Sequence, residues 1–279
     1  LHSTSRRQRQ MCIRDSYYTK KGTGSPILLI HDTLPGASGY EWSKIEDELA
    51  IDHTVYTVDL LGCGRSDKSS ITYTNFVYVQ MISDFIKKII GQKTDVIASG
   101  FSGSFVTMAC HNEKELFNKI MLVNPPSLTQ LKQMPNRKDR LLKAALEIPI
   151  FGTLVYHMIV SRDNINNLFI EKMYYNPFHV DNQMADAYYE AAHKGGYYTR
   201  FLYSSLAAKY ININICHALK ALDNSIYIVE GETEPNGKAV TDDYCASNPA
   251  IEVSVLKETK HLPHVEAPEA FLEQVKIFF

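Results

Sequence analysis

A serine, a histidine and an acid follow one another along this 279-residue chain at positions that could support nucleophilic catalysis. Ser102 lies in the stretch GFSGS (100–104) after a predicted strand, Glu234 follows another, and His261 lies near the chain's end. A serine hydroxyl becomes a good nucleophile only when an imidazole takes its proton, and a carboxylate orients that imidazole. The three residue types therefore indicate acyl transfer through a covalent intermediate.

The stretch 100–104 has the composition of a tight strand-to-helix turn. Small residues on both sides of Ser102 would let strand and helix cross closely and present the hydroxyl at the carboxyl edge of a sheet. The N–H of Gly103, at the start of that helix, is a candidate donor for an oxyanion hole. A glycine-rich turn without a catalytic role is the alternative interpretation.

Short apolar runs alternate with helical patterns from residue 17 onwards. The runs typical of buried strands are 26–31, 53–60, 94–99, 119–124, 225–230 and 251–256. Helical patterns are found over 40–50, after Thr74, over 103–110 and from Pro268 to the end. This alternation predicts right-handed crossovers and an α/β fold, with a mostly parallel sheet and helices on both faces.

The alternation stops in the middle of the chain. Between residues 127 and 216 there is no strand pattern, and the segment contains helical stretches rich in tyrosine and phenylalanine. We expect an inserted helical cap over the active edge of the sheet, with 17–126 and 217–279 forming the core. Most of its aromatic residues are expected to form the cap's own core, and the rest to line an apolar pocket.

Five stretches carry a resemblance to a known superfamily. They are LLIHD (28–32), VDLLGCGRSD (58–67), GFSGS (100–104), VEGETEP (229–235) and HLPHVEAPEAF (261–271). In this order they resemble the α/β-hydrolase superfamily, over nearly all of 17–279. The resemblance implies a cofactor-free serine hydrolase, with Ser102 as nucleophile, His261 as base, Glu234 as acid and the N–H groups of Gly103 and Thr33 as oxyanion donors. The implied substrate is a small or medium apolar ester.

Each assignment has a competitor. His264 could replace His261 as the base, and Glu232, Asp242 or Asp243 could replace Glu234 as the acid. A metal site at the two histidines is not expected, because no further cluster of ligands completes it. Ser102 argues against the family members that open epoxides or haloalkanes with an aspartate.

Three positions depart from the superfamily pattern. Asp32 stands where glycine is usual and is expected to point away, because a carboxylate would repel an oxyanion. Ser104 closes the turn in place of glycine, and Lys260 replaces the glycine usual before the histidine. These departures motivate a second hypothesis, a non-catalytic protein of this fold that binds a small molecule.

Composition limits the remaining possibilities. The formal net charge is −2 with no long run of one sign, which does not favour a nucleic-acid partner. The five cysteines form no CxxC motif. The longest charge-free apolar stretch, 148–160, is too short to span a bilayer, and we expect a cytoplasmic protein of undetermined oligomeric state.

The first 16 residues do not fit the remainder of the chain. They begin with Leu1 and contain four arginines with little apolar content. They resemble translated sequencing-adapter read-through, so we expect a non-native tail and a missing native N-terminus.

Overall fold

The computed structural model describes residues 16–279, so nearly all of the expected tail lies outside the described residues. A seven-stranded sheet has the order β1-β3-β2-β4-β5-β6-β7, with only β1 antiparallel to its neighbour. The strands are β1 (Tyr18–Lys21), β2 (Ser25–Ile30), β3 (His53–Val58), β4 (Thr94–Ser99), β5 (Phe117–Val123), β6 (Ile226–Gly231) and β7 (Glu252–Leu256). This is the mostly parallel α/β sheet that the apolar runs predict.

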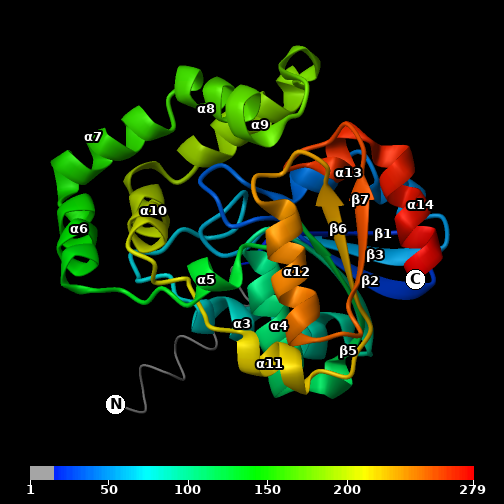
Figure 1. Ribbon diagram of the computed structural model, residues 1–279. Helices are drawn as coiled ribbons and strands as arrows, with labels where there is room; N and C mark the ends of the chain where they lie inside the picture. Colours follow the sequence, from blue (N-terminus) through cyan, green and yellow to red (C-terminus); the bar gives the residue numbers. More distant parts are fainter. Residues whose placement is uncertain (1–15) are drawn as a thin grey trace.

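Helices cover both faces of the sheet (Figure 1). One face packs mainly against α3 (Asn75–Phe85), α4 (Ser102–Asn112), α11 (Cys216–Ala221) and α12 (Gly237–Ser247). The other face packs against α2 (Glu46–Leu49) and α14 (Pro268–Phe278). Central strands are buried on both sides, which explains their continuous apolar sequences.

A helical insertion separates β5 from β6 and extends beyond the sheet (Figure 1). Its helices are α5 (Leu128–Leu131), α6 (Arg137–Glu147), α7 (Pro149–Ile159), α8 (Arg162–Leu168), α9 (Asn182–His193) and α10 (Thr199–Ala207). A π-helical turn, η4 (Phe169–Met173), continues α8. Tyr156, Tyr174 and Tyr188 of the insertion are buried in a hydrophobic cluster that also contains Ala37, Leu262 and Val265 from outside the insertion.

Two details differ from the sequence prediction. The edge strand β1 was not predicted, because its four residues alternate between exposed and half-buried and carry no apolar run. The single helix expected over 40–50 is instead a 3-10 turn, η1 (Gly39–Trp42), followed by α2.

The remaining elements are short. Two further 3-10 turns, η5 (Pro177–His179) and η6 (Gly196–Tyr198), lie in the insertion, and η3 (Lys114–Leu116) precedes β5. A π-helical turn, η2 (Ile86–Ile90), extends α3, and α13 (Pro263–Glu266) precedes α14.

Candidate active site

The turn after β4 has its left-handed backbone at Gly100, where φ is +53°. Ser102, by contrast, begins α4 two residues later. A Cβ atom at Gly100 would lie 2.2 Å from Cγ of Asp32, so the absence of a side chain leaves the room that this carboxylate occupies. Position 100, not position 102, therefore lies at the bend between strand and helix.

Asp32 points into the pair of N–H groups beside this bend. Its Oδ1 accepts hydrogen bonds from the N–H of Thr33 at 2.6 Å and from the N–H of Phe101 at 2.8 Å. The prediction that Asp32 points away from the oxyanion donors is therefore wrong. Because Gly100 has no side chain, the carboxylate fits beside the bend and accepts from two N–H groups that would otherwise have no acceptor.

The structure does not bring Ser102 to His261. The Ser102 hydroxyl donates to the carbonyl oxygen of His31 at 2.6 Å and lies 3.3 Å from the Thr33 hydroxyl, fully buried. The N–H of Gly103, expected in the oxyanion hole, donates to the carbonyl of Gly100 at 3.1 Å. Of the two expected donors, only Thr33 directs its N–H to the Asp32 carboxylate, and Phe101 provides the second N–H there.

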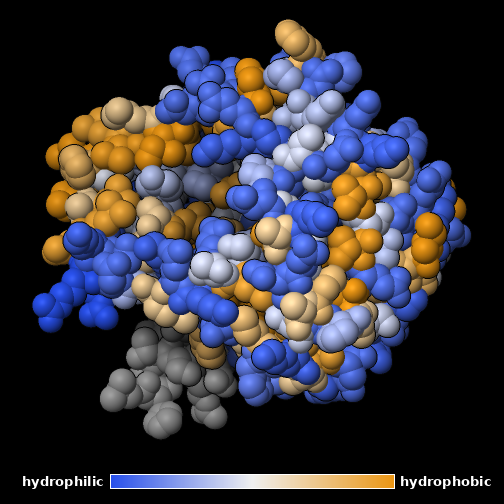
Figure 2. All heavy atoms as spheres, in the orientation of Figure 1, coloured by the Kyte–Doolittle hydropathy of each residue, from blue (hydrophilic) through white to orange (hydrophobic). Residues whose placement is uncertain are grey.

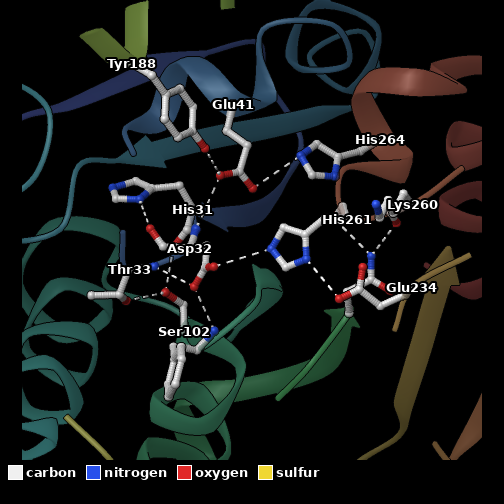
Figure 3. A network of polar contacts seen from close by, with 12 residues as sticks. His31, Asp32, Thr33, Glu41, Ser102, Tyr188, Glu234, Lys260, His261 and His264 are labelled. Carbon is white, nitrogen blue, oxygen red and sulfur yellow. Dashed lines mark hydrogen bonds and ion pairs between the residues drawn. The ribbon is translucent and has the colours of Figure 1, made fainter. Parts of the chain in front are cut away.

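His261 lies between two carboxylates, as Figure 3 shows. Its Nδ1 is 3.1 Å from Oε1 of Glu234, and its Nε2 is 3.5 Å from Oδ2 of Asp32. The second distance is that of an ion pair, longer than a good hydrogen bond. The structure thus brings together the predicted His261 and Glu234, with Asp32 in the place expected for a serine.

The two carboxylates govern the charge of His261. Burial alone would lower the pKa of the imidazole, but the contacts and charges of Asp32 and Glu234 outweigh it and raise the pKa of His261 to about 10. The imidazole is therefore protonated at neutral pH. A general base must be neutral, so at neutral pH His261 is not ready to accept a proton while both carboxylates are charged.

Backbone contacts fix the loop that carries His261. The Asn124 side-chain amide donates to the carbonyls of Lys260 and His261 at 2.8 and 2.9 Å, and the His261 N–H donates to the Met173 carbonyl at 3.1 Å. Lys260, one of the departures from the superfamily pattern, directs its ammonium group to the carbonyl of Glu171 in η4. Its side chain therefore binds the insertion.

His264, the alternative base, belongs to a second and fully buried pair. Its Nε2 lies 3.3 Å from Oε1 of Glu41, and its ring stacks on Trp42. Burial would raise the pKa of Glu41, but the contact and charge of His264 outweigh it and lower that pKa. The other Glu41 oxygen faces the N–H of Asp32 at 3.4 Å. The pair thus lies behind Asp32, and neither of its residues lines the cavity described next.

A cavity of about 530 Å³ opens on these groups. Its core side includes Asp32, Gly100, Phe101, Glu230, Glu234 and His261. Its insertion side includes Leu168, Lys172 and Met173 from α8 and η4. The wall combines apolar residues, among them Leu34, Leu168, Val240 and three prolines, with polar and charged side chains, so it can take a small substrate that has an apolar part.

Comparisons with known proteins place this chain in a family. The model of the alpha/beta hydrolase family matches residues 27–274, which is most of the chain. The chain belongs to the alpha/beta hydrolase family. The resemblance in the five sequence stretches is thereby confirmed, together with the fold that it implies.

Similar members of this family include two curated hydrolases. A 2-hydroxy-6-oxo-6-(2'-aminophenyl)hexa-2,4-dienoic acid hydrolase of Metapseudomonas resinovorans is 28% identical over 41% of this chain and 40% of its own length. A soluble epoxide hydrolase of Corynebacterium sp. strain C12 is 24% identical over 39% of this chain and 37% of its own. The chain thus matches about two fifths of these relatives' length.

Solved structures of the alpha/beta hydrolase fold superpose over nearly the whole chain. A meta-cleavage product hydrolase from Pseudomonas fluorescens IP01 has a TM-score of 0.75 at 19% identity, covering 95% of this chain and 93% of the other. The epoxide hydrolase CorEH has a TM-score of 0.77 at 17% identity, covering 95% and 94%. Identities this low show the shared fold alone.

The strand-to-helix turn fits the nucleophile-elbow pattern in two registers, and the second of them points to Asp32. The pattern of a small residue, any residue, the nucleophile, any residue and a small residue fits 98–102 (ASGFS) as well as 100–104. In this second register, 98–102, the nucleophile position is Gly100, the residue with positive φ. A carboxylate at position 32, where glycine is usual, is the accompanying signal.

Proposed function

We propose that this protein is a hydrolase that opens a strained cyclic ether such as an epoxide, with Asp32 as the nucleophile. The observation that carries the proposal is the setting of the Asp32 carboxylate. Two backbone N–H groups hold Oδ1, while Oδ2 faces Nε2 of His261 beside the cavity. A carboxylate fixed by one oxygen is oriented to attack with the other.

The occupied oxyanion hole favours a saturated carbon over a carbonyl as the target. In an ordinary acyl transfer the substrate's oxygen would need the Thr33 and Phe101 N–H groups, which Asp32 already uses. If Oδ2 attacks an alkyl carbon, Oδ1 becomes the carbonyl oxygen of the resulting ester. The two N–H groups then surround the oxygen that becomes negative when water attacks that ester.

The first step would form an ester of Asp32. Oδ2 forms a bond to a ring carbon, and the carbon–oxygen bond of the epoxide breaks. The resulting alkoxide takes the proton of the His261 imidazolium, leaving a neutral imidazole beside an uncharged ester. Loss of the Asp32 charge removes one of the interactions that raise the pKa of His261, so the imidazole can now act as a base.

The second step would return the enzyme to its initial state. Neutral His261, oriented by Glu234, takes a proton from water, and the hydroxide attacks Cγ of Asp32. The tetrahedral oxyanion on Oδ1 is held by the two N–H groups. Collapse expels the alcohol oxygen, which takes the proton from His261, and the proton left on the Asp32 carboxyl passes to His261. The net reaction adds one water to the epoxide and gives a diol.

Other substrates have weaker support from the same geometry. A haloalkane releases a halide that takes no proton from His261, so the imidazolium would have to lose its proton to solvent before it could activate water. An ester attacked by Ser102, which the sequence predicts, would require a hydroxyl that is instead donated to the His31 carbonyl. The soluble epoxide hydrolase among the relatives agrees with the proposed chemistry.

The test compares two variants on the same substrates. Diol formation from styrene oxide should fall at least about 10⁴-fold in Asp32→Asn, because the amide is not nucleophilic. Ser102→Ala should stay within about tenfold of wild type, because it loses one buried hydrogen bond outside the reacting set. In a single turnover in H₂¹⁸O, the label should enter the peptide containing Asp32 while the diol stays unlabelled.

Two results would contradict the proposal. Loss of p-nitrophenyl ester hydrolysis and of fluorophosphonate labelling in Ser102→Ala, with Asp32→Asn still active, would restore the serine mechanism. Saturable binding of styrene oxide without turnover of epoxides or esters would favour the non-catalytic binding protein.

A further inference from the structure

The insertion carries an exposed apolar surface on α6 and α7. The two helices meet at Ile148 at an angle of 96°. Six large apolar side chains on them are mostly exposed: Leu141 (71%), Ile148 (53%), Ile150 (80%), Phe151 (51%), Leu154 (61%) and Met158 (70%). Figure 2 shows an orange area at the place where Figure 1 labels α6 and α7. We call these six residues the α6–α7 surface.

The pattern along α7 shows that this exposure is systematic. Ile150, Leu154 and Met158 recur every four residues, which places them on one side of the helix. The opposite side of α7 carries Tyr156, which is buried in a hydrophobic cluster. The helix is therefore apolar on both its inner and its outer side, and large apolar patches on a protein surface usually mark a binding surface.

Internal contacts hold the bend that presents this surface. The Arg200 guanidinium reaches from α10 to the Glu147 carbonyl and to the Thr153 hydroxyl, each at 3.4 Å. A Cβ atom at Gly152 would lie 1.8 Å from the Leu146 carbonyl oxygen, so the helices meet closely only because this residue is glycine. The angle between α6 and α7 is thus a built feature of the fold.

Cations flank the same surface. Lys132, Arg137, Lys138 and Arg140 are exposed on and before α6, and the structure gives none of these four an ion pair with the residues that it describes. The acidic residues of this helix are engaged: Asp139 caps it and pairs with Lys209, and Glu147 binds Lys143 and Ser204. Figure 2 shows a blue group beside the orange area. The outward charge here is positive.

We propose that the α6–α7 surface docks on an anionic lipid bilayer and lies in its interface. Exposed apolar side chains beside unpaired cations are the combination that binds such an interface, because the first enter the acyl boundary and the second contact the headgroups. No single described helix is long and apolar enough to span a membrane; α6 and α7 pass that test only together, with a sharp bend between them. This geometry suits a helix pair that lies on a membrane.

A second copy of the chain fits this surface less well. In a two-fold dimer the same surface would meet itself, and the acidic residues of α6 that could pair with the other copy's cations, Asp139 and Glu147, are already engaged. Cations left unpaired at an interface are unfavourable, whereas anionic headgroups neutralise them. The unpaired positive charge beside the α6–α7 surface therefore selects the lipid surface as the occupant.

Vesicle co-sedimentation of the full chain tests the proposal. Wild type should bind vesicles of equal parts phosphatidylcholine and phosphatidylglycerol, and bind phosphatidylcholine alone more weakly, with the difference removed by high salt. Ile150→Asp with Leu154→Asp should weaken binding about 10²-fold or more, because two apolar side chains no longer enter the bilayer. Arg137→Gln with Arg140→Gln should weaken binding only to the anionic vesicles.

Controls separate lipid binding from folding and from dimerisation. Ile277 is 73% exposed on α14, far along the chain from this surface, and Ile277→Asp should bind vesicles like wild type. Each variant should keep the wild-type circular dichroism and melting temperature, since these side chains face solvent. Absence of binding to both vesicle types would overturn the proposal. So would a concentration-dependent dimer in size-exclusion chromatography that Ile150→Asp with Leu154→Asp abolishes.

Discussion

The carboxylate of Asp32 occupies the space that a side chain at position 100 would fill. Gly100 has a left-handed backbone, and a Cβ atom added there would lie 2.2 Å from Asp32 Cγ. Both observations show that only glycine fits at position 100 beside Asp32. The acid and the glycine fit each other, and Oδ1 of the acid takes up the two N–H groups beside the turn. Each prediction below depends on this arrangement or on the charges around it.

Replacing Asp32 and Gly100 together should convert the site into that of a serine hydrolase. Gly100→Ser alone places Cβ against Asp32 in a strained backbone conformation, and we expect a lower melting temperature and loss of diol formation. Combining Asp32→Gly with Gly100→Ser removes the clash, empties the oxyanion hole and sets a hydroxyl at the bend. That double variant should gain p-nitrophenyl ester hydrolysis and fluorophosphonate labelling. Double-variant protein that folds but reacts with neither reagent would contradict this account of the elbow.

The pH dependence of turnover should differ from that of a serine hydrolase. The proposed first step needs a protonated His261, whose pKa is raised to about 10, so kcat/KM should hold near neutral pH and fall as pH rises through about 10. A serine mechanism needs a neutral histidine, and its kcat/KM would increase over the same interval. Initial rates with styrene oxide across this pH range distinguish the two slopes.

The His261 charge should also contribute to stability. Because the folded pKa is raised above the ordinary value of 6.5, the contribution is fully present below about 6.5 and is lost as pH rises towards 10. The free energy of unfolding of wild type should exceed that of His261→Gln at pH 6.5, and the gap should narrow by pH 10. Urea unfolding at a series of pH values measures it; a constant gap would contradict the assigned charge state.

Glu230 should make the opposite contribution. It lies at the end of β6 with one carboxylate oxygen buried and without a hydrogen-bond partner. Burial raises the pKa of Glu230, and the nearby Glu234 and Asp242 raise it further. Stability should therefore fall as pH rises above the ordinary value of 4.5. Glu230→Gln should melt at a higher temperature than wild type at pH 7, with a smaller difference at pH 4.5. As a control, Glu232→Gln, which changes an exposed neighbour, should melt like wild type at both pH values.

Much of this fold follows from the sequence because its determinants are local. Continuous apolar runs bounded by turns identify buried parallel strands, and six of the seven strands overlap the predicted ranges. The pair of His261 and Glu234 could also be predicted, since chain order after a strand places both side chains at the same sheet edge.

The nucleophile could not be read in the same way. Two overlapping registers of the elbow pattern fit equally well, and a search for a reactive side chain selects the register that contains Ser102. Backbone geometry decides between them, because the residue at the bend is the one with positive φ, Gly100. The orientation of Asp32 depends in turn on the absence of a side chain at Gly100, 68 positions further along the chain. A pattern of neighbouring residues cannot show such a distant contact.

The bonds between η4 and the histidine loop have a consequence for altering the substrate range. The His261 N–H and the Lys260 side chain both bind carbonyl groups of η4, which also supplies Lys172 and Met173 to the cavity wall. The loop that carries His261 is therefore bonded directly to the insertion. Substitutions in 169–173 would shift specificity and the position of His261 together, whereas those at Gln130 or Val240, on the wall away from η4, would reshape the cavity alone.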